Sequence, residues 1–135
     1  MKIIVCIDDD DGMLFNHRRQ SQDRVLRNRI KNKTQNSKLW MNAYSFKQFK
    51  DEDTENIIVA EDFMTKADKD DFCFVENVSV TAYEDKIDSI FVYKWNRRYP
   101  SDFKFNISLK DWKLVSADEF KGSSHDNITE EVYCK

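Results

Sequence analysis

Short apolar blocks separated by polar connectors run along most of the chain. Five of these blocks are rich in β-branched and aromatic residues, and they are continuous rather than alternating. Continuous apolar runs of this length are typical of central strands that are covered on both faces. The pattern therefore predicts a largely parallel sheet. The expected strands cover residues 2–7, 38–41, 56–59, 72–75 and 89–93.

The connectors carry helix signals and, near the end of the chain, a different strand pattern. Helices are expected at residues 21 to about 32, 45–49 and 78–83. Residues 112–116 and 128–133 alternate apolar and polar side chains, as antiparallel strands at a sheet edge do. We expect an α/β fold with a mostly parallel central sheet and antiparallel C-terminal strands.

The first of these helices has the clearest boundaries. Ser21 is its expected N-cap, because serine side chains accept a hydrogen bond from the first turn of a helix. Val25, Leu26 and Ile30 follow at the spacing of a buried stripe.

Composition limits the number of domains and the classes of partner. With 135 residues, 40% of them apolar, the chain is long enough for one hydrophobic core and too short for two. We therefore expect a single domain over residues 1–135. The net charge of −3, with 35% charged residues, gives no overall attraction to nucleic acids or acidic membranes. Any basic patch must be local.

The cysteines and histidines indicate no metal site. Cys6, Cys73 and Cys134 lack the spacing of metal ligands and are expected to be small, mostly buried residues in a reducing compartment. His17 and His125 are isolated. The chain shows no signal peptide and no apolar run long enough to span a membrane, so a cytoplasmic protein is expected.

The stretch from residue 2 to residue 33 predicts a ligand cleft. An apolar strand leads through Asp8, Asp9, Asp10, Asp11 and Gly12 into a looping segment, residues 13–20, and then into the helix that carries Asp23. Many α/β proteins bind ligands where a buried strand ends in this way. The four adjacent aspartates are interpreted as a solvated turn, because their side chains diverge and no calcium-loop pattern follows.

The order of these blocks resembles the dihydrofolate reductase family. The resemblance covers essentially the whole chain and rests on the opening strand, the Gly12 loop, the blocks at 38–46, 56–59 and 73–77, and the ending. That ending runs through residues 99–105 and 111–115 to a last strand through Tyr133. The resemblance implies a reductase-like fold.

It also implies roles for particular residues. In the family, an acidic residue on the first helix lies under the pterin and assists its protonation while a nicotinamide donates hydride. Asp23 falls at that position, where an apolar cleft would raise its pKa and let it hold an amidine edge. Alternatively, Asp23 is only a first-turn acid favoured by the helix dipole. The implied ligand site also includes Ile7, Gly12, Phe15, Leu26, Tyr44 and Ser45, with Phe15 as a lid.

The departures from the family concern the cofactor. Where the family has a basic residue and a threonine for the phosphates, this chain has the run Asn42-Ala43-Tyr44-Ser45. The family's paired glycines, joined by a cis peptide bond, are replaced by Glu76-Asn77. A non-proline cis bond costs about 3–4 kcal/mol, and Glu76 would place a negative charge near a phosphate. NADPH is therefore disfavoured. The first hypothesis is a diverged member that binds a small heterocyclic or nucleotide ligand without ordinary reductase activity.

Hydrolysis by a metal centre is not expected. Short bacterial proteins similar to this one are often labelled ribonuclease Z, but the histidine-rich metal motif of that enzyme is absent here.

The second hypothesis is a nucleic-acid or protein interaction module that uses the basic segment 18–33. Seven Lys or Arg residues face one acid, Asp23, between His17 and Lys33, a local charge of +6. Such a segment could contact phosphates. The acidic clusters at residues 8–11 and 51–55 could instead balance it as a solvated face. The residues concerned are Arg18, Arg19, Arg24, Arg27 and Lys31.

Overall fold

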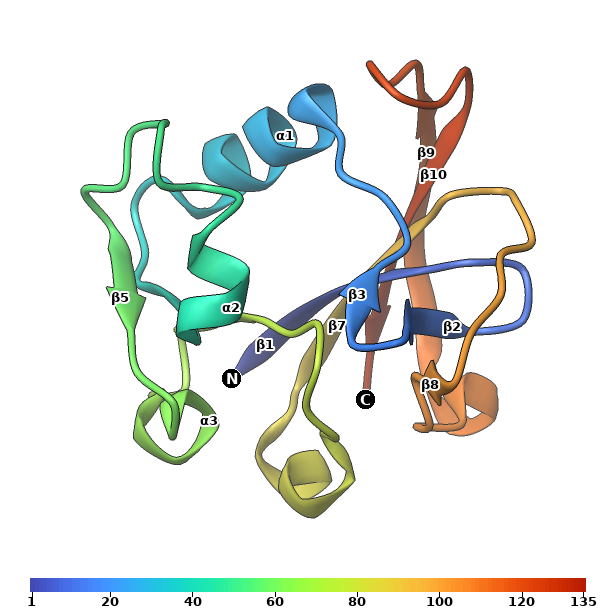
Figure 1. Ribbon diagram of the computed structural model, residues 1–135. Helices are drawn as coiled ribbons and strands as arrows, with labels where there is room; N and C mark the ends of the chain where they lie inside the picture. The colour runs from blue at the N-terminus through green and yellow to red at the C-terminus, as the bar shows by residue number, and fades with distance from the viewer.

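The computed structural model describes all of residues 1–135 and arranges the strands in two sheets (Figure 1). The large sheet has seven strands in the order β5-β4-β6-β1-β7-β10-β9. Strands β5, β4, β6, β1 and β7 are parallel, and β10 runs antiparallel to both β7 and β9. The predicted fold class is confirmed. The strands are β1 Lys2–Ile7, β4 Leu39–Met41, β5 Ile57–Val59, β6 Phe72–Phe74, β7 Ser89–Lys94, β9 Lys113–Phe120 and β10 Ile128–Cys134.

Strand β1 explains why the apolar runs are continuous. Ile3, Val5 and Ile7 are buried in one core, and Ile4 between them is buried in a second core on the opposite face. Successive side chains of a strand point to opposite faces, so a strand covered on both sides must be apolar throughout. Figure 1 shows what covers the faces: helix α1 (Arg24–Thr34) lies on one side of the sheet, and the short helices α3 (Phe63–Lys66) and η1 (Thr81–Lys86) lie on the other.

Helix α1, Arg24–Thr34, begins later than the sequence predicted. Its N-cap is Asp23 rather than Ser21, because the Asp23 carboxylate accepts the Leu26 N–H at 2.9 Å. Leu26 and Ile30 are buried as predicted, and Thr34 rather than Val25 completes the buried stripe.

The other helices have one or two turns. Helix α2, Ala43–Phe46, starts two residues before the predicted position because Asn42 caps it. The helix predicted at 78–83 is a 3₁₀ turn, η1 Thr81–Lys86. The remaining turns, α3 Phe63–Lys66 and η2 Leu109–Asp111, were not predicted, because segments this short carry no helical period. No helix has the length and hydrophobicity required to cross a membrane.

The segment predicted to be a loop, residues 13–20, is instead a hairpin in the small sheet. Strand β2, Gly12–Phe15, pairs with β3, Arg18–Arg19, on one side and with β8, Phe103–Lys104, on the other. Asn16 and His17 form the turn with φ of 51° and 62°. Two-residue hairpin turns need such angles and usually contain glycine, and a turn without glycine carries no recognisable sequence signal.

Asp8 is not part of a solvated turn, because its carboxylate is buried and accepts hydrogen bonds from several segments. Its carboxylate is 2% exposed and accepts four hydrogen bonds, two of them from the Gly12 N–H at 2.7 Å and the Tyr99 N–H at 3.0 Å. Burial alone would raise the pKa of Asp8, but these donors lower it. Asp8 therefore ties the end of β1 to the small sheet and to the segment around Tyr99.

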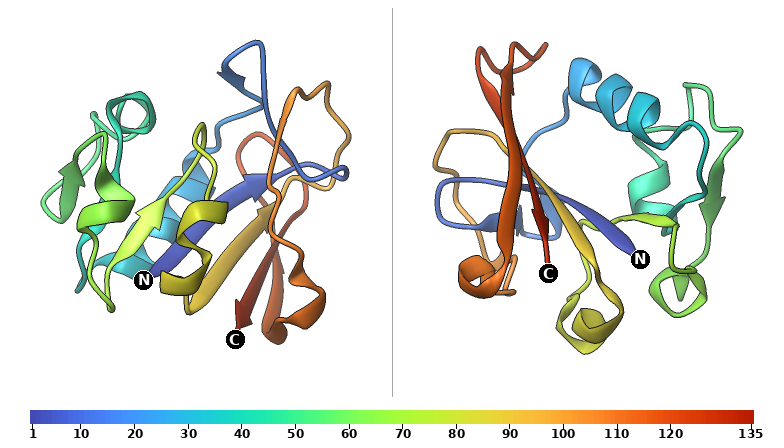
Figure 2. Two further views of the ribbon diagram at one scale, coloured as in Figure 1. Left: turned by 90° about the horizontal axis from the view of Figure 1, so that it is seen from below. Right: turned by 180° about the vertical axis from the view of Figure 1, so that it is seen from behind.

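The two ends of the chain lie at the same end of the large sheet (Figure 2). Lys2 is level with Ser89, and Ser89 is level with Cys134. All three cysteines are free.

The packing of the core predicts that alanine substitutions of Phe49 and Phe15 lower the stability by different amounts. Phe49 is 0% exposed and packs edge-on against Phe74, with ring centroids 5.3 Å apart, whereas Phe15 is 43% exposed. Phe49→Ala is expected to lower the free energy of unfolding by about 3–5 kcal/mol. Phe15→Ala should lower it by less than about 1 kcal/mol. Urea denaturation measures both, and equal losses would contradict this packing.

Candidate functional site

The candidate site is a partly enclosed pocket at the carboxyl ends of the parallel strands, beside the start of α1. It bounds about 400 Å³ of free space, part of it open to solvent. Its walls combine apolar side chains with amides, two arginines and two carboxylates, a composition that suits small polar ligands. Its lining residues are Cys6, Met13, Arg19, Gln20, Ser21, Gln22, Asp23, Leu26, Arg27, Ile30, Gln48, Phe49, Phe74, Glu76 and Trp95.

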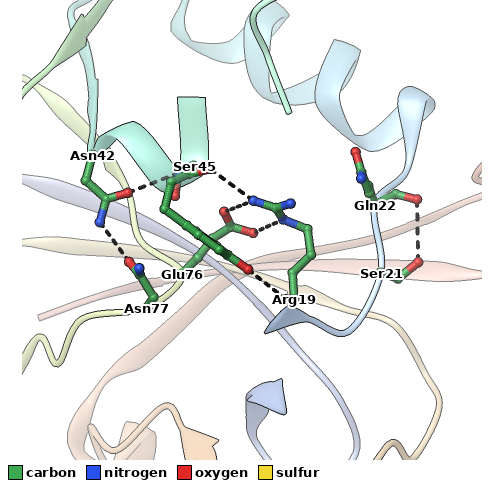
Figure 3. Close-up of polar contacts among 8 residues, drawn as sticks. Arg19, Ser21, Gln22, Asn42, Ser45, Glu76 and Asn77 are labelled. Atoms are coloured by element: carbon green, nitrogen blue, oxygen red, sulfur yellow. Dashed lines mark hydrogen bonds and ion pairs between the residues drawn. The ribbon is translucent and has the colours of Figure 1, made fainter. Parts of the chain in front are cut away.

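Arg19 and Glu76 both line this pocket and form an ion pair with each other (Figure 3). Arg19 Nε donates to Glu76 Oε2 at 2.9 Å, and Nη2 donates to Oε1 at 3.1 Å. This is the two-bond fork that a planar guanidinium makes with a carboxylate. The two side chains are only 17% and 10% exposed. The pair therefore joins β3 of the small sheet to the end of β6 in the large sheet.

Tyr44 completes the surroundings of Arg19. The guanidinium carbon lies 4.5 Å from the centroid of the Tyr44 ring, and Nη2 also donates to the Tyr44 carbonyl at 3.2 Å. The Tyr44 hydroxyl accepts the backbone N–H of Arg19 at 2.8 Å. Residue 19 is thus held through both its side chain and its main chain.

The ion pair affects the pKa values of groups in the pocket. Burial lowers the pKa of Arg19, but its hydrogen bonds with Glu76 outweigh that effect and raise it. Burial and the charge of Glu76 raise the pKa of the Cys6 thiol, so Cys6 is an uncharged part of the pocket lining.

Asp23 lines the same pocket, but its environment differs from the expected one. Besides the Leu26 N–H, its carboxylate accepts the Ser124 N–H at 2.6 Å and the Ser124 hydroxyl at 2.7 Å. Burial would raise its pKa, but these donors lower the pKa of Asp23 well below its usual range. The predicted raised pKa is therefore wrong, because the carboxylate faces N–H and O–H donors rather than an apolar wall.

Ser124 and His125 are partners of Asp23 that the sequence did not indicate. Ser124 Oγ lies 2.7 Å from His125 Nδ1, and the His125 ring stacks on Trp95. Burial and the neighbouring Arg97 lower the pKa of His125. The turn between β9 and β10 is thereby fixed to the start of α1. Because Ser124 lies 101 residues from Asp23, no local pattern could have revealed this contact.

The other predicted ligand residues divide into three groups. Leu26 lines the pocket, and Tyr44 contacts it through Arg19. Ile7 and Ser45 are buried, and Gly12 donates its N–H to Asp8. A Cβ on Gly12 would lie 2.6 Å from Ser101 Cβ, so that close approach requires glycine. Phe15 is exposed next to the hairpin turn and is not among the lining residues.

Most of the basic segment is neutralised within the protein. Arg27 and Lys31 both pair with Glu52, and Arg19 pairs with Glu76. Arg29 and Lys33 are also paired, with acidic side chains of β9 and β10. Arg18 and Arg24 are exposed and make no ion pair. The surface around α1 is therefore less positive than the sequence count suggests.

The turn after β4 is filled by side chains of the same chain. Asn42 Oδ1 accepts the Ser45 N–H at 3.1 Å, and Asn42 Nδ2 donates to Asn77 Oδ1 at 2.7 Å. The Ala43 N–H donates to Glu61 Oε2 at 3.0 Å. All peptide bonds are trans, including Glu76–Asn77. No group of three or more His, Cys, Asp or Glu side chains lies close enough to hold a metal ion.

The environment of Asp23 predicts an acid-sensitive contribution to stability. The pKa of Asp23 is lower in the folded chain than in the unfolded chain, so its charge stabilises the fold above about pH 4 and stops doing so as the pH falls through the folded value. Asp23→Asn keeps an N-cap but loses the charge, and it should cost about 1–3 kcal/mol at pH 7. This difference should shrink steadily below about pH 4.

Urea denaturation at several pH values measures this effect. Asp9→Asn is the matched control, because Asp9 is an exposed carboxylate and its loss should change stability by less than about 0.5 kcal/mol. A cost at Asp23 that stays constant from pH 7 to pH 2 would contradict the assignment.

Comparison with known proteins gives the fold. The chain is similar to dihydrofolate reductase from Enterococcus faecalis, solved as a complex with NADP(H) and RAB-propyl. The TM-score is 0.70 at 13% sequence identity, and the match covers 98% of this chain and 94% of that one. No family model and no curated protein matches the sequence. A likeness at this identity concerns architecture, while function resides in particular sites. The chain therefore has a dihydrofolate reductase-like fold.

Proposed function

We propose that this protein binds a small heterocyclic or nucleotide ligand in the pocket beside α1, and that it does not carry out ordinary NADPH-dependent reduction. The ligand enters at the carboxyl ends of β1, β6 and β7, the edge of an α/β sheet where ligands commonly bind. The observation that carries the proposal is the Arg19–Glu76 ion pair in this pocket. Its two charged groups can recognise a small polar molecule. They also occupy space that a dinucleotide would need.

The pocket supports ligand binding through its mixed lining. Leu26, Phe49 and Phe74 offer apolar surface for a ring, while Gln20 and Gln48 offer amide groups at the rim. An apolar slot with a few polar groups is typical of sites for small planar ligands.

The residues present do not fit the pyrophosphate of a dinucleotide. Glu76 stands where a phosphate would need a close backbone approach, and it carries a negative charge. At the start of α2, the Ala43 N–H is already engaged by the carboxylate of Glu61. A pyrophosphate would meet two carboxylates and lose one backbone donor, which is the reason for proposing the loss of reductase activity.

Asp23 has a positioning role in this proposal. Its two oxygens accept hydrogen bonds from Leu26 and Ser124, and its lowered pKa makes it a poor proton donor. It holds the first turn of α1 at the edge of the pocket, so that Leu26 faces the ligand.

A thermal-shift titration tests the proposal. At 100 times its dissociation constant, a ligand stabilises the folded chain by about 2.7 kcal/mol, a shift of roughly 5–14 °C for a chain of this size. We expect such a shift with at least one member of a panel of pterins, purines and mononucleotides, and none with NADPH. Amide chemical shifts should change around Leu26 and Glu76, because these residues line the pocket.

Two results would contradict the proposal in different ways. A shift with NADPH would show that the turn at Glu76 accepts a pyrophosphate. A panel that gives no shift at millimolar concentration would remove the proposed ligand class.

A further inference from the structure

The Arg19 guanidinium lies in a receptor that other segments build. Glu76 offers both carboxylate oxygens, the Tyr44 carbonyl accepts a third hydrogen bond, and the Tyr44 ring lies 4.5 Å from the guanidinium carbon. Two parallel hydrogen bonds and a π face suit a planar cation such as a guanidinium or an amidinium. A tetrahedral ammonium matches this geometry poorly.

Glu76 and Tyr44 adjoin strands of the large sheet, whereas the main chain of Arg19 is held only by its pairing with β2 and by the Tyr44 hydroxyl. Glu76 follows β6, which lies between β4 and β1 inside the large sheet, and Tyr44 lies in α2. Arg19 is the last residue of the two-residue strand β3, which is at the edge of the small sheet and pairs only with β2. Short edge elements open at low free energy, so Arg19 can leave while its receptor stays in place.

The charges around the pocket favour a cation when Arg19 leaves. Glu76 and Asp23 both line the pocket, and Arg27 is already paired with Glu52. A carboxylate as buried as Glu76, which is 9% exposed, is costly without a partner. Gln20 lines the same pocket, and its buried Oε1 has no hydrogen-bond partner. A ligand with N–H donors could satisfy both acceptors.

We propose that Glu76 and Tyr44 form a binding site for a small planar cation with a guanidinium or amidinium edge, and that Arg19 occupies this site as an internal ligand. The inference rests on the proposed ligand-binding function of the same pocket and names the chemistry of its ligand. Binding requires displacement of Arg19, together with β3, from Glu76.

The test is a titration of the full chain with benzamidinium, followed by amide chemical shifts. Arg19→Ala vacates the receptor, so benzamidinium should bind this variant at least about tenfold more tightly than the wild type, in which the tethered guanidinium competes. The shifts should center on Glu76 and Tyr44. Benzylammonium, with the same ring and charge but no planar fork, should bind the variant at least about tenfold more weakly than benzamidinium does.

Two further variants serve as controls. Arg18→Ala removes the neighbouring exposed arginine and should bind benzamidinium as weakly as the wild type does. Adding Glu76→Gln to Arg19→Ala should abolish the gain. If Arg19→Ala does not fold, Arg19→Lys takes its place, and it too should bind more tightly than the wild type, because an ammonium cannot form the fork.

The experiments distinguish failure of the internal-ligand proposal from failure of the proposed function. If the Arg19 variants bind benzamidinium no better than the wild type, or if the gain survives Glu76→Gln, the internal-ligand proposal is overturned. That result leaves the proposed function standing if a heterocycle or mononucleotide still stabilises the wild type. Conversely, tight binding of benzamidinium by Arg19→Ala, with no response of the wild type to any panel member, supports the planar-cation site and contradicts the broader ligand class.

Discussion

The pairing of Arg19 with Glu76 is the contact on which the arrangement of the pocket depends. Glu76 is buried in the folded chain, so its charge needs a partner inside the protein. Arg19 supplies that partner from the far side of the pocket and brings β3 with it. The same contact places the Arg19 guanidinium in the lining of the pocket and against the Tyr44 ring.

Two other carboxylates stabilise this end of the molecule in a different way. Asp8 and Asp23 are both 2% exposed, and both are satisfied by N–H and O–H donors rather than by a cation. Each one gathers segments that are distant in the sequence: Asp8 joins Gly12 to Tyr99, and Asp23 joins α1 to Ser124. Together they connect segments on several sides of this end of the molecule.

Much of the fold could be predicted from the sequence, because both faces of the central strands are covered and their apolar runs are therefore continuous. The hairpin at residues 12–19 could not, because its turn uses Asn16 and His17 instead of glycine. For the site, the sequence indicated the unusual charge of Glu76 and the basic character of Arg19 separately. Their pairing spans 57 residues and two sheets, so it follows from the tertiary structure alone. The contact of Asp23 with Ser124 was hidden for the same reason.

A double-mutant cycle between Arg19 and Glu76 tests the central claim most directly. Arg19→Met removes the guanidinium but keeps an apolar stem, and Glu76→Gln removes the charge but keeps the shape of the side chain. Urea denaturation of the wild type, both single variants and the double variant gives the coupling free energy. A paired, mostly buried fork predicts a coupling of about 1–3 kcal/mol. A coupling below about 0.3 kcal/mol, the scatter expected for independent sites, would contradict the account.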